Sequence, residues 1–205
     1  MGNTNTTPSL YRRKFDEQGN YLPFSGYTIV ANARHPLPTC LTDLVNTLSS
    51  SELKQYYSFL PTISYHVTIN PLEGVQNHHL SLLKDEQRKL SEQDTSSICT
   101  ADKLIRSKAL LIEVKFNETQ NENFTTKIQN IRSSQLQQAN ILHKYTLSWH
   151  LTLAYQYKPI ENDEITLKLD KLISNLSQSS IFPFDIPLDH IRICHYDDMT
   201  RFTPI

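Results

Sequence analysis

Long apolar runs are absent from this chain of 205 residues. A helix that crosses a bilayer needs roughly 20 consecutive apolar residues, and no stretch approaches that length. No signal-peptide core is visible near Met1 either. We therefore expect no transmembrane segment.

Cysteine is scarce, and the three cysteines, Cys40, Cys99 and Cys194, are far apart in the sequence. They form no Cys-x-x-Cys pair and no disulfide framework. Such scattered thiols are typical of a reduced environment, so we expect a cytoplasmic protein.

An excess of positive charge is also absent, because 20 basic side chains face 21 acidic ones and the net charge is −1. Proteins that bind long nucleic acid through its backbone usually present a basic face. The run Arg12-Arg13-Lys14 is interpreted as a solvated turn. The charge pattern argues against long duplex nucleic acid. It fits a small phosphate ester, a nucleotide or an oligonucleotide end as the partner.

The first residues are polar, and residues 1–10 are expected to be a disordered leader. The opening residues also match the N-myristoylation pattern, with Gly2 as the acceptor, so lipidation and a plain leader remain alternatives. Residues 11–205 are expected to form one monomeric domain of two lobes, because this length and an apolar content of 38% suffice for a core.

Two segments, 84 residues apart, share the pattern small hydroxyl, aromatic, His, aliphatic, Thr, aliphatic. They are Ser64-Tyr65-His66-Val67-Thr68-Ile69 and Ser148-Trp149-His150-Leu151-Thr152-Leu153. Both alternate polar and apolar residues, which predicts half-buried strands. Side chains at i, i+2 and i+4 of a strand share one face. We therefore expect Ser64, His66 and Thr68 to project together, and likewise Ser148, His150 and Thr152.

The surrounding pattern predicts helices and strands in alternation. Helices are expected over residues 37–50, 80–93, 98–107, 124–142 and 165–176, and strands over 27–31, 59–70, 109–116, 146–155, 185–194 and 201–204. Strict alternation puts Tyr155 on the face of Leu153, which predicts that Tyr155 packs in the core. A helix precedes and follows each motif strand, and this repeat suggests two similar lobes.

The paired HxT motifs resemble the 2H phosphoesterase superfamily, the LigT-like cyclic phosphodiesterases. Further blocks resemble one uncharacterised branch of it, a domain of unknown function, so that the resemblance runs from about Lys14 to Pro204. These blocks are Lys14-Phe15-Asp16, Gly19, Pro23-Phe24, Gly26 and Thr28-Ile29 at the start, Glu73-Gly74-Val75 after the first motif, and Tyr196-Asp197-Asp198-Met199 at the close. One departure is local: Asn70-Pro71-Leu72 stands where a shorter link is expected.

The resemblance implies an α+β, bilobal fold with two antiparallel sheets, flanking helices and a pseudo-two-fold axis. It places the HxT strands in an active-site groove between the lobes. It also implies phosphodiester chemistry without a metal ion or cofactor. Neither motif carries a second His, Cys or carboxylate at ligand spacing, which agrees with the expectation of no metal site.

The residue types suit acid–base chemistry on a phosphodiester. An imidazole titrates near pH 6.5, so one His can accept a proton while the other donates one. The hydroxyls of Thr68 and Thr152 are expected to bind the non-bridging oxygens. Ser64 and Ser148 are candidates for orienting the imidazoles or extending the anion site. Which His is the acid and which the base stays open.

We therefore expect a phosphodiesterase that uses His66 and His150 as catalytic residues. Its substrate would be a 2′,3′-cyclic nucleotide, a 2′-5′ linkage or a related ribose-phosphate ester. The alternative is a binding module that holds a nucleotide or an RNA end in the same cleft without cleaving it. A third hypothesis is that both motifs are structural.

Overall fold

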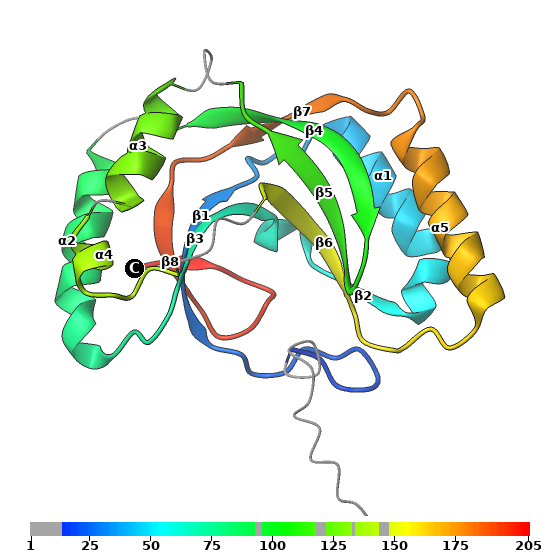
Figure 1. Ribbon diagram of the computed structural model, residues 1–205, viewed down its shortest axis with the longest axis horizontal. Coiled ribbons are helices and arrows are strands. Elements are labelled where there is room, and N and C mark those ends of the chain that lie inside the picture. Colours follow the sequence, from blue (N-terminus) through cyan, green and yellow to red (C-terminus); the bar gives the residue numbers. More distant parts are fainter. Residues whose placement is uncertain (1–13, 93–95, 118–121, 133, 144–147) are drawn as a thin grey trace, which may run out of the picture.

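A single curved antiparallel sheet organises the chain (Figure 1). The computed structural model describes residues 14–92, 96–117, 122–132, 134–143 and 148–205. The expected leader and Gly2 lie outside the described residues. Within the described part of the chain, no helix is both long and apolar enough to cross a membrane.

Nine strands form the sheet in the order β7-β4-β5-β6-β3-β1-β8-β9, with β2 paired to β6. Their bounds are β1 Gly26–Asn32, β2 Tyr57–Phe59, β3 His66–Leu72, β4 Ser97–Arg106, β5 Ala109–Lys115, β6 His150–Gln156, β7 Phe184–Leu188, β8 Arg192–Tyr196 and β9 Thr203–Pro204. The α-helices are α1 Thr39–Ser50, α2 Leu80–Ser91, α3 Glu122–Arg132, α4 Gln135–Gln138 and α5 Asp163–Ser177. The α+β class is confirmed.

The expectation of two separate sheets is wrong, because β3 and β6 pair with each other and join the halves. The register of this joint is antiparallel and sets Val67 opposite Leu151, the central residues of the two HxT motifs. Both side chains are fully buried. The two motifs therefore lie side by side in one sheet.

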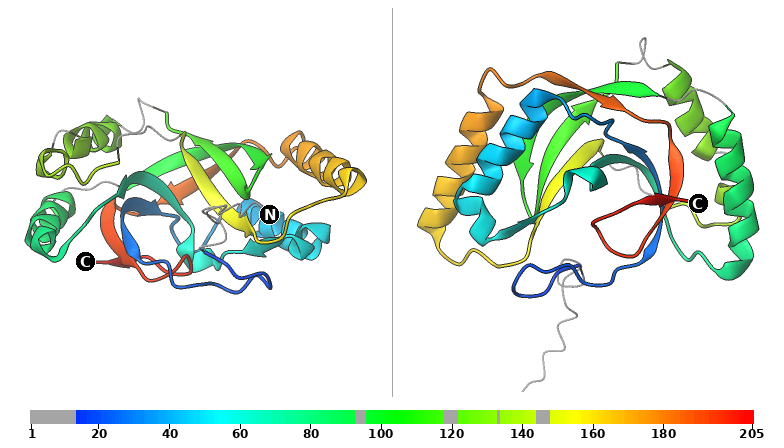
Figure 2. Two further views of the ribbon diagram at one scale, coloured as in Figure 1. Left: turned by 60° about the horizontal axis from the view of Figure 1, so that its bottom comes forward. Right: turned by 180° about the vertical axis from the view of Figure 1, so that it is seen from behind.

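Helices lie on two sides of the curved sheet, with α1 and α5 on one and α2, α3 and α4 on the other (Figures 1 and 2). The periodicity that predicts them also buries one face of each, as in α1, where Leu41, Leu44 and Leu48 are inaccessible. The α5 helix begins after Asn162, whose side-chain oxygen accepts hydrogen bonds from two backbone amides.

The helix expected over 98–107 is wrong, because these residues belong to β4. A register shift leaves Asp102 as an extra residue between Ala101 and Lys103. Ala101 and Leu104 are three residues apart in the sequence, and the bulge between them lets both side chains face the core. This spacing of apolar residues resembles that of a helix.

The helix expected over 124–142 is in fact divided into α3 and α4. Ser134 has an extended backbone, and its hydroxyl accepts a hydrogen bond from the Leu136 amide as the cap of α4. A polar residue that favours helix caps thus starts a new helix in the middle of the apolar pattern.

Candidate active site

The two motif histidines occupy equivalent places, each at the first residue of its strand. His66 Nδ1 lies 2.7 Å from the main-chain oxygen of Ser64, and His150 Nδ1 lies 2.7 Å from that of Ser148. A carbonyl oxygen only accepts, so Nδ1 carries the hydrogen in both rings. The Nε2 atoms are therefore the ones left for proton transfer.

Both Nε2 atoms are accessible for that purpose. Neither has a hydrogen-bond partner among the described residues, and neither is a buried unpaired atom. The main chain thus fixes the tautomer and the ring orientation in both motifs. This is the arrangement that a general acid or base needs before a substrate arrives.

One face of the sheet carries the four motif side chains. Because Val67 lies opposite Leu151, the antiparallel register sets His66 across from Thr152 and Thr68 across from His150. All four are partly exposed, whereas Val67 and Leu151 point into the core. Diagonal neighbours of such a pair have Cβ atoms roughly 7–8 Å apart, a span that one phosphate group can bridge between two imidazoles. We call these four residues the HxT face.

The serines of the motifs do not project with the histidines. Ser64 lies in the short turn Thr62–Ser64, and its buried hydroxyl donates to the Pro61 oxygen at 2.7 Å. Ser148 precedes β6 and is exposed. The expectation that the Ser64 hydroxyl shares the face with His66 is wrong, because β3 begins two residues later and the hydroxyl is used within the turn. The carbonyls of these serines, not their side chains, contact the rings.

A β-bulge follows the Thr of each motif. In β3 the register skips Ile69, and in β6 it skips Leu153. Leu153 and Ala154 are therefore both fully buried, and Tyr155 moves to the face of Thr152. The expected core packing of Tyr155 is confirmed, because its ring packs against the core beside Phe15. The expected face is wrong, because the Tyr155 hydroxyl is hydrogen-bonded to the Thr152 side chain.

Aromatic rings border the HxT face from the His66 side. Phe202 packs on the His66 ring with centroids 4.1 Å apart. The Tyr196 ring lies 5.3 Å from Phe202, and the Phe24 ring lies 6.2 Å from Tyr196. Tyr196 also covers Gly26, where a Cβ atom would lie 2.5 Å from its hydroxyl oxygen. A side chain at position 26 would have to displace the Tyr196 ring, and this close contact brings the opening and closing blocks together beside the first motif.

Lys14, which the sequence interpretation placed in a solvated turn, lies against two aromatic rings. Its ammonium group lies 4.3 Å from the centroid of the Tyr155 ring and donates to the Tyr155 hydroxyl at 3.3 Å. It also lies 5.2 Å from the centroid of Phe24. The sequence feature that could have identified Lys14 is its place in the block Lys14-Phe15-Asp16, which resembles the start of the family branch.

The electrostatics of the site set the charge of His66. Burial, with smaller contributions from the nearby positive charges of His150 and Lys14, lowers the pKa of His66 to about 4. His66 is consequently neutral at pH 7. The interaction also shows that the two imidazoles and the ammonium group of Lys14 are close enough to influence one another.

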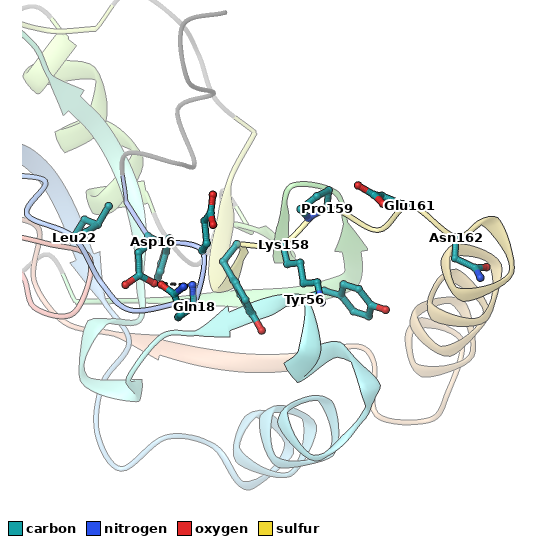
Figure 3. A pocket seen from close by; sticks show the side chains of 11 residues that line it. Asp16, Gln18, Leu22, Tyr56, Lys158, Pro159, Glu161 and Asn162 are labelled. Carbon is teal, nitrogen blue, oxygen red and sulfur yellow. Dashed lines mark hydrogen bonds between the residues drawn. The ribbon is translucent and has the colours of Figure 1, made fainter.

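A cavity of about 870 Å³ lies between the N-terminal turn and the segment before α5 (Figure 3). It extends from the N-terminal turn, where Asp16 and Gln18 line it, to Glu161 and Asn162 before α5. None of the four HxT residues lines it. Its carboxylates disfavour a phosphate, so we do not assign the phosphate site to it.

Among the described residues, no group of three or more His, Cys, Asp or Glu side chains could hold a metal ion.

The amino-acid sequence is similar to a family of known proteins and to one viral protein. Residues 14–90 match the family model described as "2H-phosphodiest: Domain of unknown function (DUF1868)". Uncharacterized protein 127L of Invertebrate iridescent virus 6 is 23% identical over 238 residues, covering 95% of each chain.

Two solved structures share the fold. The conserved protein of unknown function ATU0111 from Agrobacterium tumefaciens has a TM-score of 0.63 and 16% identity, with 94% of this chain and 89% of that chain covered. The protein TT0787 of Thermus thermophilus has a TM-score of 0.57 and 12% identity, with 82% of this chain and 87% of that chain covered.

Proposed function

We propose that this chain is a phosphodiesterase that needs no metal ion. Residues 14–90, which contain the first HxT motif, match a family model described as 2H phosphodiesterase-like, and this match supports the proposal. The substrate class is a 2′,3′-cyclic nucleotide, a 2′-5′ linkage or a related ribose-phosphate ester. The observation that carries the proposal is the matched pair of imidazoles, each held by a main-chain carbonyl at Nδ1 with Nε2 accessible.

His66 is assigned as the general base. A base must be neutral before it can accept a proton, and the lowered pKa keeps His66 in that form at pH 7. In hydrolysis of a cyclic ester, His66 Nε2 takes a proton from water while the water oxygen bonds to phosphorus.

His150 is assigned as the general acid. Its protonated Nε2 gives a proton to the ribose oxygen as the bond between that oxygen and phosphorus breaks. The two Thr hydroxyls donate to the non-bridging oxygens, where negative charge accumulates in the transition state. The site can thus supply and remove one proton in each turnover.

The direct test is turnover of 2′,3′-cyclic nucleotides and 2′-5′-linked dinucleotides by the full chain with a chelator present. We expect a phosphomonoester product at an unchanged rate when the chelator is added. Activity that disappears on chelation contradicts the metal-independent chemistry. Tight binding of these compounds without turnover favours the binding module.

The pH dependence follows from the state of His66. As pH falls, the base is lost only when His66 becomes protonated near its pKa of about 4. We therefore expect protonation of His66 to leave kcat/KM unchanged between pH 7 and roughly pH 5, and kcat/KM to fall as pH approaches that pKa. Initial rates across this range, with circular dichroism to verify folding, provide the measurement. An acid limb centred near the ordinary imidazole pKa of about 6.5 would contradict the assignment of His66.

Replacing Thr68 or Thr152 by Val should reduce kcat/KM about 10- to 100-fold, the usual effect of losing a hydrogen bond to a charged group. Valine keeps the shape of the side chain and removes only the hydroxyl. The matched control is Thr47→Val on the exposed surface of α1, which should retain full activity. Equal rates in all three variants would exclude the Thr hydroxyls from the reaction.

A further inference from the structure

Lys14 is a partly buried cation near the HxT face. Its ammonium group lies between the rings of Phe24 and Tyr155. Within the described part of the chain, no carboxylate lies within ion-pair distance of it. Burial of a charge without an opposite charge is costly, so such a group usually serves a ligand or shifts its pKa.

Burial does lower the pKa of Lys14, to about 8. The group nevertheless remains mostly protonated at pH 7, because that value is still above neutrality. Of its three hydrogens, one is used on the Tyr155 hydroxyl. The others have no acceptor among the described residues, so an incoming anion would find free donors.

The position of this cation relates it to both motifs. Tyr155 holds Lys14 on one side and the Thr152 hydroxyl on the other. The charge of Lys14 is also felt at His66, in the first motif. Through these contacts the charge of Lys14 lies near residues of both motifs.

We propose that Lys14 binds the phosphoryl group at the HxT face, with Tyr155 as the residue that positions it. This inference rests on the proposed function and adds a residue outside both motifs. Lys14 supplies a fixed positive charge at neutral pH, which matches the single negative charge of a phosphodiester. Its ammonium group contacts a non-bridging oxygen, where an aliphatic residue would leave the anion uncompensated.

The competing interpretation is that Lys14 is structural and only covers the two aromatic rings. Lys14→Met keeps the apolar stem and removes the charge, whereas Lys14→Arg keeps the charge. A packing role predicts lower stability for both substitutions. A phosphate-binding role predicts that Lys14→Met loses phosphate affinity and Lys14→Arg retains most of it.

The test measures binding rather than turnover, using the full chain. Calorimetry compares adenosine 2′-monophosphate with adenosine, which differs only in lacking the phosphate. Lys14→Met should lower the affinity for the monophosphate about 10- to 100-fold and leave the affinity for adenosine unchanged. Tyr155→Phe removes the hydroxyl that accepts a hydrogen bond from Lys14 but keeps the ring. It should lower the affinity for the monophosphate by a smaller factor, and it is the second test if Lys14→Met does not fold.

The pH readout separates charge from packing. The titratable groups near Lys14 are His66 from β3, His150 and Tyr155 from β6 and, beyond the Phe24 ring, Tyr196 from β8. Burial lowers the pKa of His66 and raises the pKa of both tyrosines, so these three groups do not titrate between roughly pH 8 and 9.5. Affinity for the monophosphate should fall over this range in the natural chain and remain level in Lys14→Arg.

Each outcome decides between the two proposals. Phosphate binding that depends on Lys14 without any turnover retains this inference and rejects the phosphodiesterase. Turnover with equal monophosphate affinity in Lys14→Met and the natural chain rejects this inference and retains the phosphodiesterase. No binding of the monophosphate by the natural chain also rejects it.

Discussion

Replacing His66 or His150 by Ala is expected to lower turnover of the cleaved substrate by about 10²–10⁴-fold, the usual contribution of one positioned acid or base. Each substitution removes the only side chain of its motif that can exchange a proton at neutral pH. The His66 ring packs on Phe202, so stability must be followed together with activity. Steady-state rates with thermal unfolding in parallel provide the measurement.

The two single variants should resemble the double variant, because a reaction that needs both proton transfers fails when either is missing. His78→Ala is the matched control, since His78 is an exposed histidine in the turn Asn77–His79. It should keep full activity. Full activity in His66→Ala and His150→Ala would reject the mechanism, and unfolding of both would favour structural motifs.

Leu151→Ala should destabilise the protein by about 2–5 kcal/mol, the range for large-to-small changes in a core. Leu151 is fully buried and lies opposite Val67 at the joint between the two halves of the sheet. A cavity at this point loosens the joint that sets the distance between the imidazoles. Turnover by the folded fraction should therefore also fall. Urea unfolding followed by circular dichroism gives the change in free energy.

The same substitution elsewhere provides the comparison. Leu167 on α5 is 69% exposed, so Leu167→Ala should change the free energy of unfolding by no more than about 0.5 kcal/mol. Equal stability of the two variants would mean that the β3–β6 joint is not a tightly packed part of the core.

The sequence predicts the helices and the motif strands because their apolar residues follow regular periods. Helix α2, expected over 80–93, is an example: it spans Leu80–Ser91 and buries Leu83 and Leu90. The placement of His66 and Thr68 on one face also follows from the period of a strand.

The errors have one main physical cause, which is the β-bulge. A bulge adds one residue to a strand, and every side chain beyond it changes face. At Asp102 this produced a false helix, and at Leu153 it hid the role of Tyr155. No residue type marks these positions, because pairing with the neighbouring strand decides where the register shifts.

Contacts between distant segments could not be predicted either. Lys14 and Phe202 approach the motifs only because β1, β8 and β9, from opposite ends of the chain, follow one another beside β3 in the sheet. Their side chains carry no local pattern. The resemblance blocks pointed to Lys14, and nothing pointed to Phe202.

The carbonyl oxygens of Ser64 and Ser148 have a consequence for protein engineering. Every residue type has a main-chain carbonyl, so the hold on each imidazole does not depend on which side chain stands two positions earlier. The exposed position 148 can therefore carry other residue types without a change in the orientation of the His150 ring. Randomising this position is a way to alter which leaving groups the site accepts while the proton-transfer geometry is kept.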